Sequence, residues 1–282
     1  MNQQPSRHSF LRNTALAAAG AALARPLIGL AAEEPKKKIP LGVQLYSVRN
    51  ELKTDFNGVI EKLGKMGYQG VEWASGLERT KNANELRKLL DDNGLKTCGT
   101  HTALITLQGD ALKSTIDFHK ELDNKFLICP SMSAKSEQDW LNLAKQFNGI
   151  AAKCKEAGMF TGYHAHAGDF KTKFNDKTTW EIFFDNTDKE VIHQIDVGNT
   201  MDGGGDPLAM IKKYPGRTKT THIKEHGGPK DAAIGEGTID WNVLLGTLES
   251  VGGTEWYIVE YEHDKPLEKI KTCLDNLHKL GR

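Results

Sequence analysis

Cysteine is scarce in this sequence, and no two cysteines are spaced as in a metal-binding or redox motif. The four cysteines, Cys98, Cys129, Cys154 and Cys273, form no CxxC pair, which argues against a zinc ribbon or a related thiolate metal site. Cys98 and Cys129 lie in apolar, strand-like runs, so we expect isolated buried thiols. A disulfide is compatible with an oxidising compartment, but the spacing selects no pair.

An excess of charge of either sign is also missing. The 282 residues contain 37 basic and 37 acidic side chains, and this balance argues against a general nucleic-acid binder and against an acidic disordered chain. The balance is the sum of two unlike parts. Residues 1–32 contain three arginines and no acid, a charge of +3, whereas the remaining residues contain 34 basic and 37 acidic side chains, a charge of −3.

Long apolar runs are lacking, and the run near the N-terminus is typical of an export signal. The basic segment Met1–Arg12 precedes the uncharged, Ala-rich run Asn13–Ala24, and small residues and then a charged segment from Glu33 follow. This is the order of a secretory signal peptide. The uncharged run has 12 residues, fewer than the about 20 that a transmembrane helix needs, so we expect no stable membrane insertion.

The segment Ser6–Arg12 resembles a twin-arginine signal, with His8 in place of the second arginine. We therefore predict a periplasmic or otherwise exported protein. Its predicted parts are a signal peptide over residues 1–32, a linker over residues 33–40 and a single domain over residues 41–282.

After residue 40, short apolar runs alternate with amphipathic patterns. Stretches such as Trp140–Ala151 and Ile270–Leu277 have apolar residues spaced as on one face of a helix. Strands that alternate with helices indicate a parallel sheet. The eight predicted strands are Leu41–Tyr46, Gly70–Trp73, Lys96–Gly99, Phe126–Cys129, Phe160–His164, Ile192–Asp196, Thr218–Ile223 and Tyr257–Glu260.

Eight strand–helix repeats in a domain of this length favour the α/β class and a single (β/α)8 TIM barrel. The alternative is a doubly wound open sheet, which usually carries a glycine-rich phosphate loop after its first strand. Here the first predicted strand continues into Gln44–Arg49, a segment without glycine. The later cluster Gly203–Gly205 lacks the GxGxxG spacing, so the sequence favours the barrel.

Metal-capable or polar side chains end most of the predicted strands. The carboxyl ends of the strands build the active site of a TIM barrel, so we expect these side chains to meet at one rim. They are Gln44, Glu72, His101, His164 with His166, Asp196, His222 with Lys224 and Glu225, and Glu260.

Histidine, aspartate and glutamate without cysteine form a ligand set for one divalent metal ion, such as Mn²⁺, Zn²⁺, Co²⁺ or Mg²⁺. Such an ion would bind neighbouring sugar oxygens and polarise a carbonyl group as a Lewis acid. A carboxylate would then remove the adjacent carbon-bound proton as a general base. This chemistry serves aldose–ketose isomerisation, epimerisation next to a carbonyl, and β-elimination from a keto-sugar.

Several segments carry recognisable motifs. Gly162–Phe170 reads Gly-Tyr-His-Ala-His-Ala-Gly-Asp-Phe, and Asp196–Asn199 is followed by Gly203–Pro207. These segments resemble the Tyr-His-Asn-His-x-x-Glu-Phe and Asp-x-Gly…Gly-Gly-x-Asp-Pro motifs of the sugar phosphate isomerase/epimerase family, the xylose isomerase-like TIM barrels. The resemblance covers roughly residues 39–280, and the other similar segments are Leu41–Arg49, Thr221–Glu225, Gly235–Trp241 and Trp256–Glu260.

This resemblance implies one metal ion held by groups from the fifth to the eighth strand. Carried over by position, the ligands are His164, Asp196, His222 and Glu260, with His166 as an alternative to His164. The sequence departs from the family motifs at three positions, where Ala165 replaces Asn, Asp169 replaces Glu and Glu225 replaces Asp.

We predict three catalytic residues: Glu260 or Glu72 as the base, and Lys224 to stabilise an enediolate oxygen. The predicted substrate-binding residues are Gln44, His101, His166 and Glu225.

The predicted function is a metal-dependent isomerase or epimerase that acts on a sugar or keto-sugar by removing a proton next to a carbonyl. One alternative is a keto-glycoside lyase or hydratase that uses the same metal site, and another is a non-catalytic, exported sugar-binding barrel. A multi-metal endonuclease of the same superfamily is disfavoured, because a domain with a charge of −3 does not suit phosphate backbones. The predicted partner is a small-molecule carbohydrate and not nucleic acid, and assembly into a homo-oligomer is left open.

Overall fold

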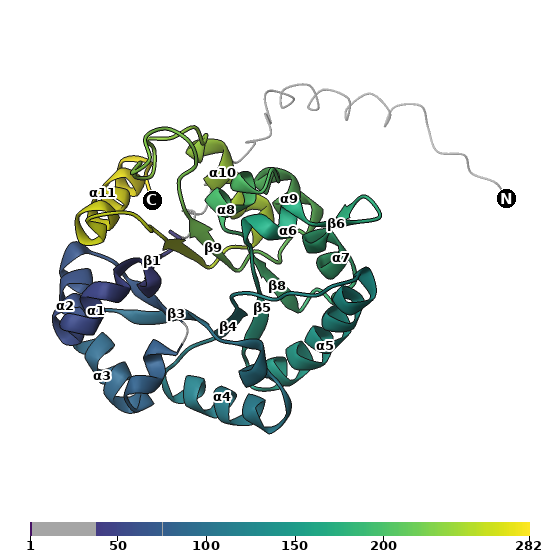
Figure 1. The fold of residues 1–282 in the computed structure, drawn as a ribbon, viewed down its shortest axis with the longest axis horizontal. Coiled ribbons are helices and arrows are strands. Elements are labelled where there is room, and N and C mark those ends of the chain that lie inside the picture. The colour runs from purple at the N-terminus through teal and green to yellow at the C-terminus, as the bar shows by residue number, and fades with distance from the viewer. Residues whose placement is uncertain (2–37, 75) are drawn as a thin grey trace. The chain divides into compact units, whose positions relative to one another are not determined.

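Eight short parallel strands surround the axis of the fold in the computed structural model, which describes Met1, residues 38–74 and residues 76–282 (Figure 1). The strands are β1 (Leu41–Gln44), β2 (Gly70–Trp73), β3 (Lys96–His101), β4 (Phe126–Cys129), β5 (Phe160–His164), β8 (Val191–Gln194), β9 (Thr220–Ile223) and β10 (Trp256–Val259). They pair in the order β8-β5-β4-β3-β2-β1-β10-β9.

The two ends of this order meet beyond β8 and close the barrel. An isolated parallel bridge joins Asp196 to His222. The backbone N–H of His222 donates to the carbonyl oxygen of Ile195 at 2.8 Å, and that of His193 donates to the carbonyl oxygen of Arg217 at 3.0 Å. The seam between β8 and β9 is therefore held by fewer backbone contacts than the continuous ladders elsewhere.

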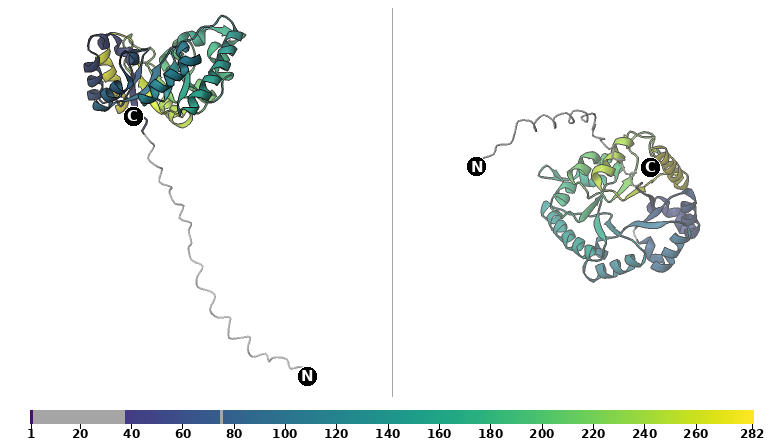
Figure 2. Two further views of the ribbon diagram at one scale, coloured as in Figure 1. Left: turned by 90° about the horizontal axis from the view of Figure 1, so that it is seen from below. Right: turned by 180° about the vertical axis from the view of Figure 1, so that it is seen from behind.

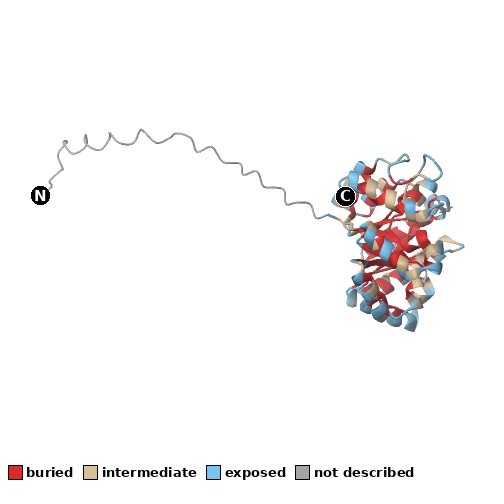
Figure 3. Ribbon diagram, turned by 90° about the vertical axis from the view of Figure 1, so that its left-hand side faces the viewer, coloured by how far each residue is buried: buried red, intermediate tan, exposed pale blue. Residues whose placement is uncertain are grey.

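Burial on both faces explains why these runs form strands. Every residue of β1, β2, β4, β8 and β9 is buried, as expected for a parallel sheet that is covered by helices on its outer face. Figure 3 shows the buried residues gathered on the strands and the exposed residues on the outer faces of the helices.

Helices follow the strands and form a ring around them, seen from the side and from behind in Figure 2. Their buried residues recur with helical spacing, as with Val59, Ile60 and Leu63 of α2. The helices are α1 (Arg49–Thr54), α2 (Phe56–Met66), α3 (Ala83–Asp92), α4 (Gly109–Glu121), α5 (Glu137–Glu156), α6 (Ala167–Lys171), α7 (Thr179–Asp185), α8 (Val197–Asp202), α9 (Pro207–Lys213), α10 (Trp241–Thr247) and α11 (Pro266–Lys279).

Short segments complete the connections. Single helical turns follow several strands or extend a helix: η1 (Leu45–Val48), η2 (Leu77–Thr80), η3 (Leu104–Leu107) and η4 (Leu248–Gly252). A two-stranded antiparallel hairpin, β6 (Lys173–Phe174) and β7 (Lys177–Thr178), lies between α6 and α7.

Side-chain caps and one glycine set the ends of the helices. At the start of α2, Asp55 Oδ1 accepts the N–H of Gly58 at 2.9 Å, and at the start of α5, Ser136 Oγ accepts the N–H of Asp139 at 3.2 Å. Such caps satisfy backbone donors that the helix itself leaves unpaired. Gly67 ends α2 with φ = 103°, a conformation that glycine adopts with little strain.

The interior of the barrel is apolar at its N-terminal end and polar at its C-terminal end. The apolar part is a separate cluster of Phe126, Ile128 and Ile192 with Phe160 and Trp256 packed against it. Three of these residues begin their strands, so the cluster fills the N-terminal end. Gly70 leaves room for it, because a Cβ at this position would lie 2.7 Å from the Trp256 ring.

The predicted single TIM barrel is confirmed. All eight predicted strands are present, and β2, β4 and β5 have the predicted bounds. The strand predicted as Ile192–Asp196 instead ends at Gln194, because Asp196 begins the next helix. The hairpin β6–β7 is an addition that the sequence did not predict.

Other expectations concern the cysteines and the N-terminal region. All four cysteines are buried and free, as expected. In the described part of the chain, no helix is long and apolar enough to cross a membrane. The described residues from Lys38 onward form one compact unit, whereas the predicted signal peptide lies almost entirely outside the described residues.

Candidate functional site

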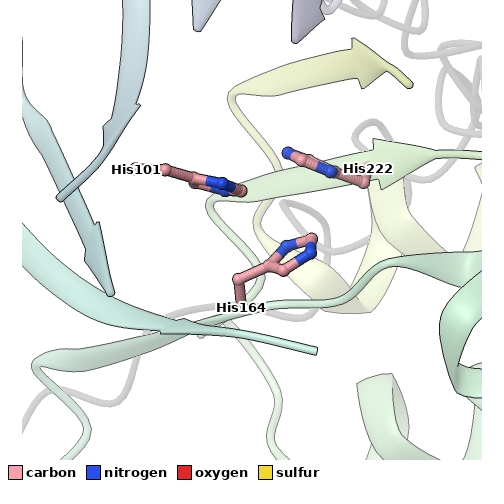
Figure 4. Close-up of side chains that lie close together, drawn as sticks. All are labelled: His101, His164 and His222. Atoms are coloured by element: carbon pink, nitrogen blue, oxygen red, sulfur yellow. The ribbon is translucent and has the colours of Figure 1, made fainter. Parts of the chain in front are cut away.

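Side chains at the carboxyl ends of the strands form a buried polar layer. His101 comes from the end of β3, His164 from the end of β5 and His222 from β9, and Figure 4 shows their rings pointing toward one another. The three ring centroids lie 4.5, 4.6 and 5.2 Å apart. Residues more than a hundred positions apart in the sequence are thus brought together by the closure of the barrel.

Four residues form what we call the metal cluster: His164, Asp196, His222 and Glu260. One possible ligand atom of each lies within 4.8 Å of the others. His222 Nδ1 lies 2.8 Å from Glu260 Oε2 and 3.7 Å from Asp196 Oδ2. None of the four is more than 8% exposed, so bulk water does little to compensate the charges of the carboxylates.

Asp196 uses its two carboxylate oxygens differently. Oδ1 accepts the backbone N–H of Asn199 at 2.8 Å and thereby caps α8. Oδ2 is buried and has no hydrogen-bond partner among the described residues. An unpaired buried carboxylate oxygen is costly, and a cation would compensate that cost. Two imidazoles and two carboxylates form a suitable ligand set for a divalent metal ion.

Three further residues, Gln44, Glu72 and Gln194, form what we call the support layer. Glu72 Oε2 accepts hydrogen bonds from His222 Nε2 at 2.6 Å and from Gln44 Nε2 at 2.6 Å. Glu72 Oε1 accepts one from Gln194 Nε2 at 2.7 Å. A carboxylate that binds one nitrogen of an imidazole commonly orients the other toward a metal. Here His222 gives Nε2 to Glu72 and presents Nδ1 to the metal cluster.

Neighbouring charges control the ionisation of the cluster. Burial by itself lowers the pKa of His222, but Glu72 and Glu260 outweigh burial and raise it well above its usual value. Burial by itself raises the pKa of Glu260, but His222 and Lys224 bring it below its usual value. Burial, together with His222 and His101, holds the pKa of His164 well below its usual value. A neutral His164 keeps a lone pair for a metal.

Lys224 adds a positive charge beside the metal cluster. Its Nζ donates to Asn199 Oδ1 at 3.2 Å and forms an ion pair with Glu262. Burial by itself lowers the pKa of Lys224, but Asp196, Glu260 and Glu262 raise it above its usual value. The side chain is 15% exposed, so the ammonium group is largely buried but retains contact with solvent.

This arrangement matches a known family of barrels. A family model described as xylose isomerase-like TIM barrel matches residues 60–280. The chain belongs to this family. An inosose dehydratase of Clostridium perfringens is 27% identical over 224 residues, which are 70% of this chain and 71% of the relative.

Solved structures have a similar fold. A sugar phosphate isomerase/epimerase from Parabacteroides distasonis superposes with a TM-score of 0.74 at 25% identity, over 88% of this chain and 95% of that chain. The IolI protein with a zinc atom superposes with a TM-score of 0.66 at 15% identity, over 86% of this chain and 98% of that chain. The second likeness is one of fold alone. Together with the cluster, the family fits a sugar-modifying metal enzyme.

The structure brings the four predicted metal ligands of this xylose isomerase-like barrel together. The alternative first ligand, His166, is exposed and lies outside the cluster found among the described residues. Its ring packs edge-on against His164 with 4.8 Å between the centroids. His166 is therefore placed beside the cluster, where a substrate contact stays a prediction.

Other predicted site residues have different surroundings. Gln44 and Glu72 are fully buried and bind each other, so we interpret both as positioning residues rather than as groups that face substrate. His101 is buried, and its Nε2 lies 2.8 Å from Gln194 Oε1. Glu225 holds its own loop together, because its Oε2 accepts the N–H of Gly235 at 2.6 Å and Trp241 Nε1 at 2.8 Å.

Two residues of the site were not predicted, Gln194 and Asn199. Gln194 lies two positions before Asp196 in a predicted strand, so the period of two places both side chains on one face. The search took the polar residue that ends each predicted strand, which for this strand was Asp196. Asn199 links Lys224 to the barrel, because its Nδ2 donates to the carbonyl oxygen of Ala165 at 3.2 Å while its Oδ1 accepts from Lys224.

Proposed function

We propose that this protein is a divalent-metal-dependent enzyme that removes a carbon-bound proton next to the carbonyl group of a sugar or keto-sugar. The observation that carries the proposal is the convergence of His164, Asp196, His222 and Glu260 in one buried cluster, with Asp196 Oδ2 lacking a hydrogen-bond partner among the described residues. The names of its relatives, inosose dehydratase and sugar phosphate isomerase/epimerase, support a carbohydrate substrate.

The four residues of the metal cluster would hold the ion. Two imidazoles with two carboxylates suit Zn²⁺, Co²⁺ or Mn²⁺ and suit Mg²⁺ less, because Mg²⁺ prefers oxygen ligands. The ion, when bound, supplies Lewis-acid polarisation of a carbonyl group and positions for neighbouring sugar oxygens. The zinc atom in IolI supports this choice of metals.

Glu260 is the proposed general base. It is 8% exposed, whereas Glu72 is fully buried, so Glu260 is the better placed of the two predicted bases to meet a substrate. Its lowered pKa keeps it ionised and able to accept a proton at neutral pH. The electron pair of the broken C–H bond then forms a carbon–carbon double bond, and the carbonyl oxygen gains negative charge. Lys224 would stabilise that oxygen through its positive charge.

The fate of this enediolate separates two candidate activities. Return of the proton to the neighbouring carbon or to the opposite face gives an isomer or an epimer, which is the activity predicted from the sequence. Loss of a hydroxyl group from the next carbon, with uptake of a proton, releases water and makes the protein a dehydratase. The inosose dehydratase relative favours this second candidate.

Incubation in heavy water with a panel of ketoses, keto-glycosides and inososes tests the proposal. NMR would report deuterium at the carbon next to the carbonyl, and mass spectrometry would report loss of water. We expect metal-dependent exchange or dehydration with at least one substrate class. The proposal is wrong if neither the metal-loaded nor the metal-free enzyme exchanges a carbon-bound proton in any of them.

A pair of variants tests the role of the metal cluster. Asp196→Asn keeps a helix-capping oxygen but removes the charge, so we expect loss of bound metal and a fall in activity of at least 100-fold, of the order attributed to metal-ion catalysis. Asp206→Asn is the matched control, since Asp206 also caps a helix, α9, but lies outside the cluster. Wild-type protein without metal by elemental analysis, and not stabilised by added Mn²⁺ or Zn²⁺, would favour a sugar-binding barrel.

We also propose that the protein is exported and acts on an uncharged, unphosphorylated sugar. The order of residues in the first 32 positions supports export. The pairing of Lys224 with Glu262 supports an uncharged substrate, because it balances the positive charge that a phosphate group would require. Cell fractionation tests the first part, and an uncleaved chain in the cytoplasm would overturn it.

A further inference from the structure

Gln194 occupies the centre of the polar layer and uses its amide completely. Its Oε1 lies 2.8 Å from His101 Nε2 and 2.9 Å from His164 Nδ1. Its Nε2 donates to Glu72 Oε1 at 2.7 Å and to Thr220 Oγ1 at 2.9 Å. An amide has two donor hydrogens and an acceptor oxygen with two lone pairs, so all four positions are filled within a fully buried residue.

Chemistry allows only one orientation of this amide. If its oxygen and nitrogen were exchanged, the oxygen would face the Glu72 carboxylate at the 2.7 Å now bridged by a hydrogen bond. Two acceptors would then oppose each other in a fully buried site, which is strongly unfavourable. The Glu72 carboxylate thus turns the amide nitrogen toward itself and the amide oxygen toward His101 and His164.

The oriented amide determines which ring nitrogens carry hydrogen. An amide oxygen only accepts, so the nitrogens that contact it, His101 Nε2 and His164 Nδ1, must both donate. A neutral imidazole has a single N–H, and in His164 that N–H is at Nδ1. Its Nε2, which Gln194 does not contact, is left with a lone pair.

We propose that Gln194 is a positioning residue that fixes the Nδ1–H tautomer of His164 and so makes Nε2 of that histidine a metal-binding atom. The role is parallel to that of Glu72, which takes Nε2–H of His222 and leaves Nδ1 to the metal cluster. The proposal rests on the metal site of the proposed function. Glu72 therefore orients both imidazoles of the metal cluster. It binds His222 directly, and it acts on His164 through the amide of Gln194.

Two substitutions separate this role from a merely structural one. In Gln194→Met the new side chain has a similar length but lacks the amide oxygen and the amide N–H groups. His164 would therefore lose the partner that fixes its tautomer. Gln194→Glu keeps an acceptor oxygen for His164, either as a carboxylate or as a carboxylic acid. Gln44→Met is the matched control, since it removes the other buried amide that binds Glu72 and none that binds His164.

The tautomer is read directly in the full-length, metal-free protein by ¹⁵N NMR of labelled histidine, with the His164 signal assigned by its loss in His164→Asn. We expect the Nδ1–H form in wild type, Gln194→Glu and Gln44→Met, and a mixed or Nε2–H form in Gln194→Met. We also expect Gln194→Met to weaken Zn²⁺ binding by roughly 10–100-fold, the usual effect of removing a partner of a metal-binding histidine.

The outcomes divide cleanly. An Nε2–H tautomer in wild type, or a Gln194→Met protein with the wild-type tautomer and wild-type Zn²⁺ affinity, overturns the proposal. If Gln194→Met does not fold, the wild-type spectrum and Gln194→Glu decide, because loss of the Nδ1–H form in Gln194→Glu would contradict the assigned role. The tautomer is measured without metal or substrate, so failure of the proposed catalytic function would leave this result standing.

Discussion

At the scale of single residues, the site is built by giving each buried polar group a defined partner. Glu72 is the clearest case, because a fully buried carboxylate is tolerated only when it is paired. Burial by itself raises its pKa, but the neighbouring His101 and His222 bring that pKa below its usual value. The charge of Glu72 is therefore retained inside the barrel, where it orients the groups that face the metal cluster.

One prediction at this scale concerns the space beside Glu72. The register of β2 against β3 shifts between Val71 and Glu72, and a Cβ at Gly99 would lie 2.7 Å from Glu72 Oε1. Gly99→Ala should displace the carboxylate, lower the unfolding free energy by about 1–3 kcal/mol and weaken metal binding. Denaturant unfolding and metal titration measure both effects.

The control for Gly99→Ala is Gly149→Ala in α5. A Cβ at Gly149 meets nothing within 4 Å, and alanine favours a helix over glycine by up to about 1 kcal/mol. Gly149→Ala should thus be neutral or stabilising and leave metal binding unchanged. Equal losses of metal affinity in the two variants would contradict the role given to Gly99.

A second prediction concerns His193, which lies among aromatic rings away from the metal cluster. Burial lowers its pKa to about 3, whereas an unfolded histidine has a pKa of about 6.5. The unfolded chain therefore binds an extra proton below pH 6.5, and this site's contribution to stability is lost as pH falls from 6.5 toward 3. The loss from this site is about 2 kcal/mol at pH 5.

His193→Gln removes this titration. Chemical denaturation at pH 7.5 and pH 5 measures the unfolding free energy of both proteins. Between the two pH values, the unfolding free energy of the wild type should fall by about 2 kcal/mol more than that of the variant. A difference between wild type and variant that stays constant with pH would show that His193 does not carry the effect.

At the scale of elements, the sequence predicted the strands well and the smaller elements poorly. β2, β4 and β5 have the predicted bounds, and of these β4 is apolar throughout whereas β2 and β5 include polar residues such as Glu72 and His164. The predicted end of β8 was wrong, because the apolar Ile195 suggested that the strand continues to Asp196, whereas Asp196 caps α8. The polar residues at the predicted strand ends indicated the rim of the barrel, and the family resemblance selected four of them as candidate metal ligands. Neither source reveals the hydrogen-bond partners of these residues, and therefore Gln194 was missed.

The hairpin β6–β7 carries a prediction of its own. Asn175 and Asp176 form its turn with φ of 48° and 67°, and Asn-Gly is the preferred sequence for such a turn. Asp176→Gly should raise the unfolding free energy by about 0.5–1 kcal/mol, since an aspartate strained at positive φ is replaced.

The exposed strand residue Lys173 supplies a control of opposite sign. Lys173→Gly places glycine where the backbone is extended, so it should lower the unfolding free energy by about 0.5–1 kcal/mol. Thermal or chemical unfolding of both variants measures the difference. If Asp176→Gly and Lys173→Gly both lower the unfolding free energy, Asp176 does not strain the turn.

At the scale of the whole molecule, the barrel is apolar at one end and polar at the other, and the polar end carries the proposed metal site. An ion that binds only the folded state at 100 times its dissociation constant adds about 2.7 kcal/mol, or roughly 5–10 °C in Tm for a chain of this size. We expect added Zn²⁺ or Mn²⁺ to raise Tm by this amount and a chelator to reverse the rise. Differential scanning fluorimetry measures both changes.

The same experiment on His193→Gln provides a control, because that variant keeps the metal cluster intact. It should begin from a different Tm but show the same rise with metal. Asp196→Asn should show little or none. A rise of equal size in Asp196→Asn would indicate that the ion binds elsewhere on the protein.

The bridge that closes the barrel joins Asp196 to His222, and both residues belong to the metal cluster. An ion bound there would therefore hold together the least extensively paired seam of the barrel, between β8 and β9, the two ends of the strand order. Catalysis and closure would then depend on the same two side chains. Substitutions that change the bound metal would also change how readily the seam opens, which hydrogen exchange at the His222 amide would register.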